Sequence, residues 1–214
     1  MTATDVAVLV FGDRVVPRPL KGLAVQHVGG TVDIDDAAGR WRRLVVVGDD
    51  RDLAAVLTRL LRLERLDVEV GFVSRRRSPA TRAYRLTTGG RAARRARAGT
   101  ARRVPLIRDD SGAAIAGSAT WRGAGGPLHG EAVVDDTTLF HGDVAAVRVQ
   151  PTGEHPGLRA AVLTPGGRPR RWVVGRAAQL GTTGALVERD GVTAPRRVVR
   201  STFYRHIQGW LLAR

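Results

Sequence analysis

The chain has 214 residues, of which 43% are apolar, enough for one domain or two small ones with packed cores. It has no cysteine, which excludes disulfides and thiolate metal sites, and no apolar run approaches the roughly 20 residues of a membrane-spanning helix. The formal net charge of +15 favours an anionic partner, either a nucleic acid or an anionic membrane surface.

Strands and a helix alternate along the first half of the chain. Four consecutive apolar residues, Leu44 to Val47, suit a strand buried on both faces. Apolar residues then recur at positions 53, 56, 57, 60 and 61, the spacing of an amphipathic helix. Strand, helix and strand in succession form a βαβ unit, which predicts a parallel sheet. The strands are expected at residues 5–10, 23–28, 41–47 and 68–73, with an acidic connector at 33–39.

A basic segment, residues 75–108, follows these strands. Between Glu69 and Asp109 there are twelve arginines and no acidic residue. Ser78 followed by Pro79 is a favourable helix start, and residues 91–98 are a second helix candidate. We expect these two helices to hold most of the arginines on solvated faces.

The second half of the chain contains only short strands, separated by Gly, Pro and Asp turns. They are expected at residues 104–107, 113–121, 130–134, 144–149, 158–163, 172–175, 185–188, 198–204 and 210–212. This spacing predicts an antiparallel β-sandwich. The sequence therefore predicts an N-terminal parallel α/β domain at residues 1–107 and a C-terminal β-sandwich domain at residues 108–214.

The turn between the buried strand and its helix contains Gly48, Asp49, Asp50 and Asp52. Many α/β proteins hold a phosphate at such a turn, but through backbone amides rather than carboxylates. These carboxylates have two open interpretations, since they suit either a metal such as Mg²⁺ or the capping of the helix that follows.

A run of three arginines, Arg75, Arg76 and Arg77, follows the next strand. Their guanidinium groups are suited to hold a phosphate, although a solvated basic turn is an equal alternative. Because the acidic and basic turns each follow a strand, we expect them to face one another across an interdomain cleft. Their carboxylates and guanidiniums would then pair where a nucleotide otherwise binds.

The segment VVVGDDRDLAAVL resembles the GGDGT loop of the diacylglycerol kinase catalytic family, which shares its fold with the NAD kinases. Gly48 matches the first glycine and Asp50 the aspartate. Asp49 and Arg51 replace the other two glycines, and Asp52 replaces the threonine. The resemblance implies a lipid kinase ancestry with ATP and Mg²⁺ as cofactors.

Two further segments are similar to motifs of that family. VGFVSRRRSPATRAYRL lies over the GTGND loop and its helix and retains Arg82 and Ala83. ALVERDGV resembles the late Asp-Gly-Glu motif, with Asp190 and Gly191 retained. Val192 takes the place of the glutamate that the family is thought to use in catalysis, and valine cannot accept a proton.

The resemblance and its departures together imply a divergent lipid-kinase-like protein, a pseudoenzyme with weak or no phosphoryl transfer. It would bind a nucleotide or an anionic lipid in the interdomain cleft, through Gly48, Asp50, Arg75, Arg76, Arg77 and Arg82. Asp50 is the catalytic and metal-binding candidate if activity is retained, and only then are ATP and Mg²⁺ expected as cofactors.

The alternative function is a non-catalytic module that binds nucleic acid or an anionic membrane through the basic segment 75–108. The first residues lack the basic flank and long apolar core of a signal peptide. We therefore expect a cytoplasmic protein, with the inner membrane surface as a further location if the segment binds lipid.

Overall fold

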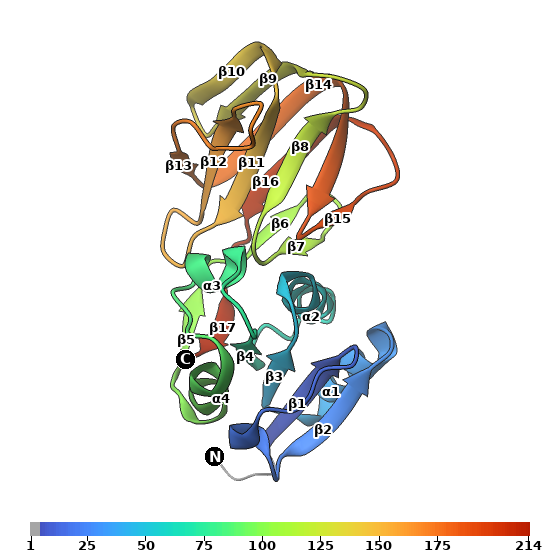
Figure 1. The fold of residues 1–214 in the computed structure, drawn as a ribbon, viewed down its shortest axis with the longest axis vertical. Helices are drawn as coiled ribbons and strands as arrows, with labels where there is room; N and C mark the ends of the chain where they lie inside the picture. Colours follow the sequence, from blue (N-terminus) through green and yellow to red (C-terminus); the bar gives the residue numbers. More distant parts are fainter. Residues whose placement is uncertain (1–4) are drawn as a thin grey trace. The chain divides into compact units, whose positions relative to one another are not determined.

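The computed structural model describes residues 5–214, and the chain forms two compact units (Figure 1). The first unit contains the residues up to Val104 together with Gln208–Arg214, and the second contains Pro105–Ile207. The first is built on a six-stranded, mostly parallel sheet, and the second on an eleven-stranded antiparallel sheet. The predicted fold class, an α/β domain followed by an antiparallel β-sandwich, is confirmed.

The first unit has these elements in chain order: β1 (Val6–Phe11), η2 (Arg18–Leu20), β2 (Ala24–Val28), α1 (Thr31–Arg40), β3 (Arg43–Val47), α2 (Asp50–Arg62), β4 (Glu69–Val73), α3 (Pro79–Ala83), α4 (Gly89–Ala98), β5 (Ala101–Val104) and β17 (Trp210–Ala213). The sheet order is β2-β1-β3-β4-β17-β5, and only the pair β17 and β5 is antiparallel. Every residue of β1 and β3 is buried, as expected for strands covered on both faces.

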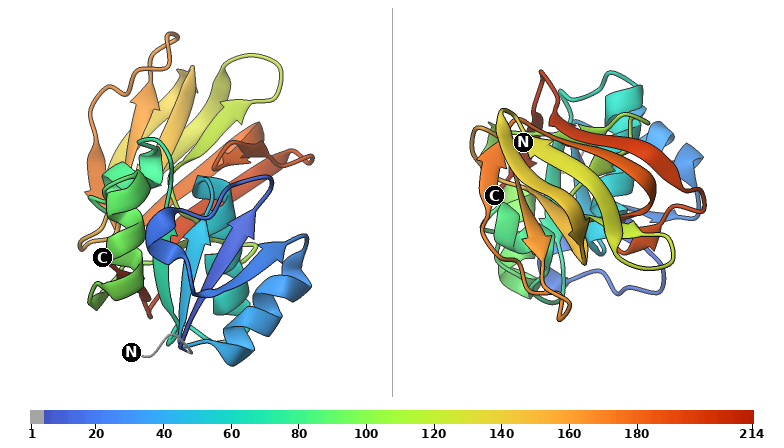
Figure 2. Two further views of the ribbon diagram at one scale, coloured as in Figure 1. Left: turned by 60° about the horizontal axis from the view of Figure 1, so that its bottom comes forward. Right: turned by 90° about the horizontal axis from the view of Figure 1, so that it is seen from above.

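Helices cover both faces of this sheet, with α4 on one side and α1 and α2 on the other (Figure 1, Figure 2). Ala92, Ala93 and Ala96 of α4 pack in one cluster with valines of β1 and β3. A Cβ atom on Gly71 would lie 2.5 Å from the Cβ of Ala96, so glycine in β4 allows α4 this close approach. No helix in residues 5–214 is both long enough and apolar enough to cross a membrane.

Arg43 fixes the end of α4 to the sheet from within the core. Its side chain donates to Glu69 Oε2 at 2.6 Å and to the carbonyl oxygens of Arg97 and Gly99, each at 2.9 Å. Arg43 is only 3% exposed, and these contacts satisfy carbonyls that a helix end leaves without an intrahelical partner.

Helix α1 replaces the acidic connector that the sequence predicted at residues 33–39, and that prediction is wrong. Asp33 Oδ2 accepts hydrogen bonds from Gly29 N and Gly30 N at 2.8 and 3.0 Å, which caps the helix start. Ile34, Ala37 and Ala38 form the buried side. The acidic residues of this helix were misread as a loop signal because they occupy its more exposed face.

The second unit has these strands in chain order: β6 (Ile107–Asp109), β7 (Ala114–Ile115), β8 (Ala119–Gly123), β9 (Leu128–Val134), β10 (Thr137–Val144), β11 (Ala146–Pro151), β12 (Leu158–Leu163), β13 (Val173–Gly175), β14 (Ala177–Arg189), β15 (Val192–Thr193) and β16 (Val198–Arg205). The register of β14 shifts between Gly181 and Ala185, so its first half pairs with β9 and its second half with β8. The sheet closes over a core that contains Trp121 and Phe203, whose ring centroids lie 5.6 Å apart.

The last strand of the chain belongs to the first unit. The sequence assigned residues 210–212 to the sandwich, and this is wrong, because β17 pairs with β4 and β5. The predicted strand 104–107 is likewise divided, since Pro105 lacks the N–H that a continuous ladder needs. Residues before it form β5 in the first sheet, and residues after it form β6 in the second.

Candidate functional site

The carboxyl ends of β1, β3 and β4 border a pocket of about 730 Å³ within the first unit, called here the strand-end pocket. Open α/β sheets bind their ligands at this edge of the strands. Most of its lining comes from the three turns that follow these strands, with Gly89 contributed by the start of α4. The charged residues of the lining are Asp13, Arg14, Arg18, Asp49, Arg75 and Arg76.

The acidic turn after β3 is folded onto itself at the start of α2. Asp49 is the residue before the helix, and its N–H donates to Asp52 Oδ2 at 2.7 Å. A Cβ atom on Gly48 would lie only 2.6 Å from that same oxygen, so glycine is required for this approach. The capping interpretation is therefore correct for Asp52. Its carboxylate accepts a hydrogen bond from a backbone N–H of the kind that a phosphate loop uses to bind its ligand.

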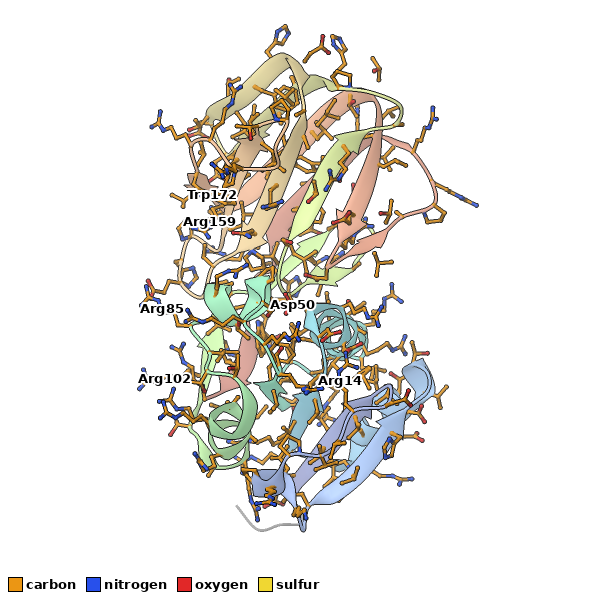
Figure 3. All side chains as sticks on the ribbon, viewed as in Figure 1. Arg14, Asp50, Arg85, Arg102, Arg159 and Trp172 are labelled. Atoms are coloured by element: carbon orange, nitrogen blue, oxygen red, sulfur yellow. The ribbon has the colours of Figure 1, made fainter. Side chains whose placement is uncertain are left out.

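Arg14, in the turn after β1, pairs with two carboxylates of this turn, and Arg51 Nε lies 3.8 Å from Asp52 Oδ1. Arg14 Nη2 lies 2.5 Å from Asp49 Oδ2 and its Nη1 3.5 Å from Asp52 Oδ2. Arg14 is labelled in Figure 3. The sequence predicted that the arginines of the Arg75 turn pair with these carboxylates. Among residues 5–214, the pairing found for Asp49 is with Arg14 instead. The sequence analysis did not identify Arg14 as a site residue. Its position just after a buried strand of the same sheet could have indicated this role.

Asp50 is buried, with 8% of its surface exposed, and it does not line the strand-end pocket. Its Oδ2 accepts a hydrogen bond from Ala80 N, at the start of α3, at 3.0 Å. Burial raises the pKa of this carboxyl above its ordinary value, against the opposing effects of the Ser78 hydroxyl and the Ala80 N–H. Asp50 thus connects α2 to α3.

The predicted phosphate-binding arginines are divided between two pockets. Arg75 and Arg76 line the strand-end pocket with Gly48. Arg77 and Arg82 line a separate pocket beside α3 and α4. All four arginines are exposed, and α4 likewise presents its arginines to solvent, as the sequence predicted, and Ala92, Ala93 and Ala96 to the core.

The retained late motif, Asp190 and Gly191, forms the turn of the β14–β15 hairpin. Both residues have positive φ angles, +47° and +84°, which suit Asp-Gly in a two-residue hairpin turn. The carboxylate of Asp190 also accepts hydrogen bonds from the backbone N–H groups of Ala116, Gly117 and Ser118. The fold of the second unit accounts for this Asp-Gly pair, and Val192 follows it in an exposed strand.

Mg²⁺ is the metal that the kinase resemblance implies. Asp49 is engaged with Arg14, Asp52 with the turn amide and Asp50 with Ala80. In residues 5–214 no group of three His, Asp or Glu side chains is arranged to hold a metal ion. Because the three carboxylates of the acidic turn each have another partner and do not converge on a common point, they do not fit a bound Mg²⁺ ion.

Neither a protein-family model nor a curated protein matches the sequence. The structure is similar to a diacylglycerol kinase from Bacillus anthracis str. Sterne, with a TM-score of 0.71 and 11% identity over 100% of this chain and 98% of that one. It is also similar to an NAD kinase from Archaeoglobus fulgidus in complex with ATP, with a TM-score of 0.64 and 12% identity over 98% of this chain and 93% of that one. These likenesses establish the fold, and it is the fold that the sequence motifs implied.

Proposed function

We propose, from the premise that the chain has the fold of diacylglycerol kinases and NAD kinases, that it binds a nucleotide in the strand-end pocket and has weak or no phosphoryl-transfer activity. The observation that carries this proposal is the lining of that pocket, in which four arginines outnumber two aspartates. An excess of guanidinium groups suits a diphosphate or triphosphate, because each group presents a fork of donors to phosphate oxygens.

The pocket also has an apolar wall. Val15, Val16 and Pro17 contribute to its lining beside the arginines. A nucleotide has an apolar base and a charged phosphate end. A pocket with an apolar wall and an arginine-lined wall therefore favours a nucleotide over inorganic phosphate alone. One structural neighbour, the NAD kinase, is in complex with ATP, which supports the same class. An anionic lipid head group is the alternative ligand, since it offers the same phosphate chemistry.

Weak phosphoryl-transfer activity is supported by the contacts of the acidic turn, whose groups bind other parts of the chain or oppose a phosphate. The Asp49 N–H is occupied by Asp52, and the Asp49 carboxylate lies in the pocket lining, where it repels a phosphate. Asp50 is buried against α3 instead of lining the pocket. Val192 has no group that accepts a proton. ATP and Mg²⁺ act as cofactors only if some transfer activity survives.

Calorimetric titration with ATP, beside a transfer assay with ATP, Mg²⁺ and mixed lipids, tests the proposal. We expect ATP binding that weakens when Arg75 and Arg76 are replaced by alanine, and no turnover. The matched control is the double variant Arg40→Ala with Arg62→Ala, which removes two exposed arginines from other helices. Absence of ATP binding would remove the proposed site, and turnover abolished by Asp50→Ala would show an active kinase.

A second candidate function is the binding of a polyanion, nucleic acid or anionic membrane, by the basic segment 75–108. The observation that favours it is the exposed face of α4, which carries Arg91, Arg94 and Arg95 without an acidic residue. Phosphate contacts of this kind weaken steeply with salt. Filter binding and liposome sedimentation at rising salt test it, and absent or salt-insensitive binding to all polyanions would end this candidate.

A further inference from the structure

Consecutive arginines in the turn after β4 line two different pockets. Arg75 and Arg76 line the strand-end pocket, whereas Arg77 lines a second concavity of about 480 Å³ in the same unit, called here the arginine pocket. The arginine pocket is formed by α3, the turn that joins α3 to α4, and the first turn of α4. It shares no residue with the strand-end pocket.

Four arginines and no carboxylate line the arginine pocket. The arginines are Arg77, Arg82, Arg85 and Arg91, and all four are exposed. Among residues 5–214, no salt bridge to a carboxylate within 4 Å is found for Arg77, Arg82 or Arg91, although the charge of Arg82 acts on the buried Asp50 carboxyl and opposes the rise of its pKa. By contrast, Arg14, Arg43 and Arg59 of the same unit are each paired with an aspartate or glutamate. Arg77, Arg82 and Arg91 carry like charges around one concavity and repel each other, and an anion placed among them removes that repulsion.

Neutral donors complement the guanidinium groups. Thr87 lines the arginine pocket, and its Oγ1 is buried with no hydrogen-bond partner among the described residues. Helix α4 begins beside it at Gly89. Thr88, the residue before the helix, makes no side-chain cap, and the first turn of α4 has no acidic residue. The positive end of this ten-residue helix therefore adds to the field of the arginines.

We propose that the arginine pocket is a second binding site, specific for a compact phosphate group that carries at least two negative charges. Diphosphate and the phosphate monoester of a lipid head group share this chemistry, since both present several oxygens to forked guanidinium donors. This proposal does not depend on nucleotide binding in the strand-end pocket. The experiments below distinguish a free phosphate compound from a lipid head group as the ligand.

The first experiment is a calorimetric titration of the full chain with pyrophosphate. The variant Arg82→Ala with Arg91→Ala is compared with the control Arg40→Ala with Arg62→Ala, which removes the same charge from α1 and α2. A third variant, Arg14→Ala with Arg75→Ala, weakens the strand-end pocket alone. Circular dichroism melting curves verify that each variant is folded.

We expect the Arg82 and Arg91 variant to lose about tenfold or more in pyrophosphate affinity, while the Arg14 and Arg75 variant keeps this site. An equal loss of pyrophosphate affinity in the Arg40 and Arg62 control would overturn the proposal, because the affinity would then depend on the net charge of the protein and not on this pocket. A loss confined to the Arg14 and Arg75 variant would also overturn it, because the ligand would then occupy the strand-end pocket.

The second experiment distinguishes the sources of the phosphate. Sedimentation with phosphatidylcholine vesicles is compared with and without phosphatidic acid, and phosphatidylserine replaces phosphatidic acid as the lipid with a phosphodiester. Binding that needs phosphatidic acid and is lost in the Arg82 and Arg91 variant assigns the site to a lipid head group. Binding of pyrophosphate alone assigns it to a free ligand, and no binding in either experiment would refute the site.

Discussion

Arg14 Nη2 lies 2.5 Å from Asp49 Oδ2, and both residues line the strand-end pocket. The side chains are 24% and 60% exposed, so the pair lies in a solvent-screened environment and its contribution to stability is small. Its importance is instead for binding. While Arg14 is held by Asp49, part of its donor capacity is not available to a phosphate.

Substitutions of these two residues should change nucleotide affinity in opposite directions. Arg14→Ala removes a cation and leaves Asp49 unpaired in the lining, so we expect ATP affinity to fall about tenfold. Asp49→Asn removes the competing carboxylate, so we expect affinity to rise a few fold. Calorimetry measures both, and a change in the same direction for the two variants would contradict the arrangement.

Asp50 should make the stability of the first unit depend on pH. Because burial raises its folded-state pKa, its stabilising contribution is greatest below about pH 4 and is lost as pH rises through the folded pKa. Asp50→Asn keeps an oxygen for Ala80 N without the buried charge. We expect the variant to unfold at higher urea than the parent at pH 7, with the difference narrowing toward pH 4. A difference that does not vary with pH would disprove the burial argument.

Replacement of Arg43 should destabilise the first unit strongly. Arg43→Met leaves the largely buried carboxylate of Glu69, which is 12% exposed, without its cation and removes donors from the end of α4. Breaking a buried pair in this way costs about 3–5 kcal/mol of unfolding free energy. Urea unfolding monitored by circular dichroism measures it. Arg42→Met, at the adjacent exposed position, is the control and should change stability by less than about 0.5 kcal/mol.

Asp190 should act as a structural residue of the second unit. Asp190→Ala leaves three backbone N–H groups without their acceptor and places alanine at a positive φ, at a cost of about 2 kcal/mol. Thermal unfolding measures the change, with the exposed Asp136→Ala as the control. An unchanged melting temperature would contradict this role and return Asp190 to consideration as a functional residue.

The fold was largely predictable because its strongest elements have strong local patterns. The buried strand at 44–47 and the stripe from Leu53 to Leu61 correspond to β3 and α2. The alternation of apolar residues did not locate strand β10, since Thr137, His141 and Asp143 interrupt its apolar pattern with polar residues. The resemblance of residues 131–144 to a hairpin of the kinase family did indicate it, and β9 and β10 form that hairpin. The pairing of β17 was beyond sequence reasoning, because a short apolar strand fits equally well in either sheet.

The candidate site was predictable in its position and not in its contacts. Gly48, Arg75 and Arg76 do line one pocket, as their places after neighbouring parallel strands suggested. The partner of Asp49 came from a third turn, and three adjacent arginines separated into two pockets. Side-chain direction within a turn depends on tertiary contacts, so residue order alone does not determine it.

The interior position of β17, between β4 and β5, has a consequence for the order of assembly. Trp210–Ala213 follow every strand of the second unit in the sequence, so the first sheet gains this inner strand only where the chain returns from the second unit. The first unit therefore depends on a segment that lies more than a hundred residues after its other elements. Removal of Trp210–Ala213 would leave β5 without its partner and expose an unpaired edge of β4 to aggregation.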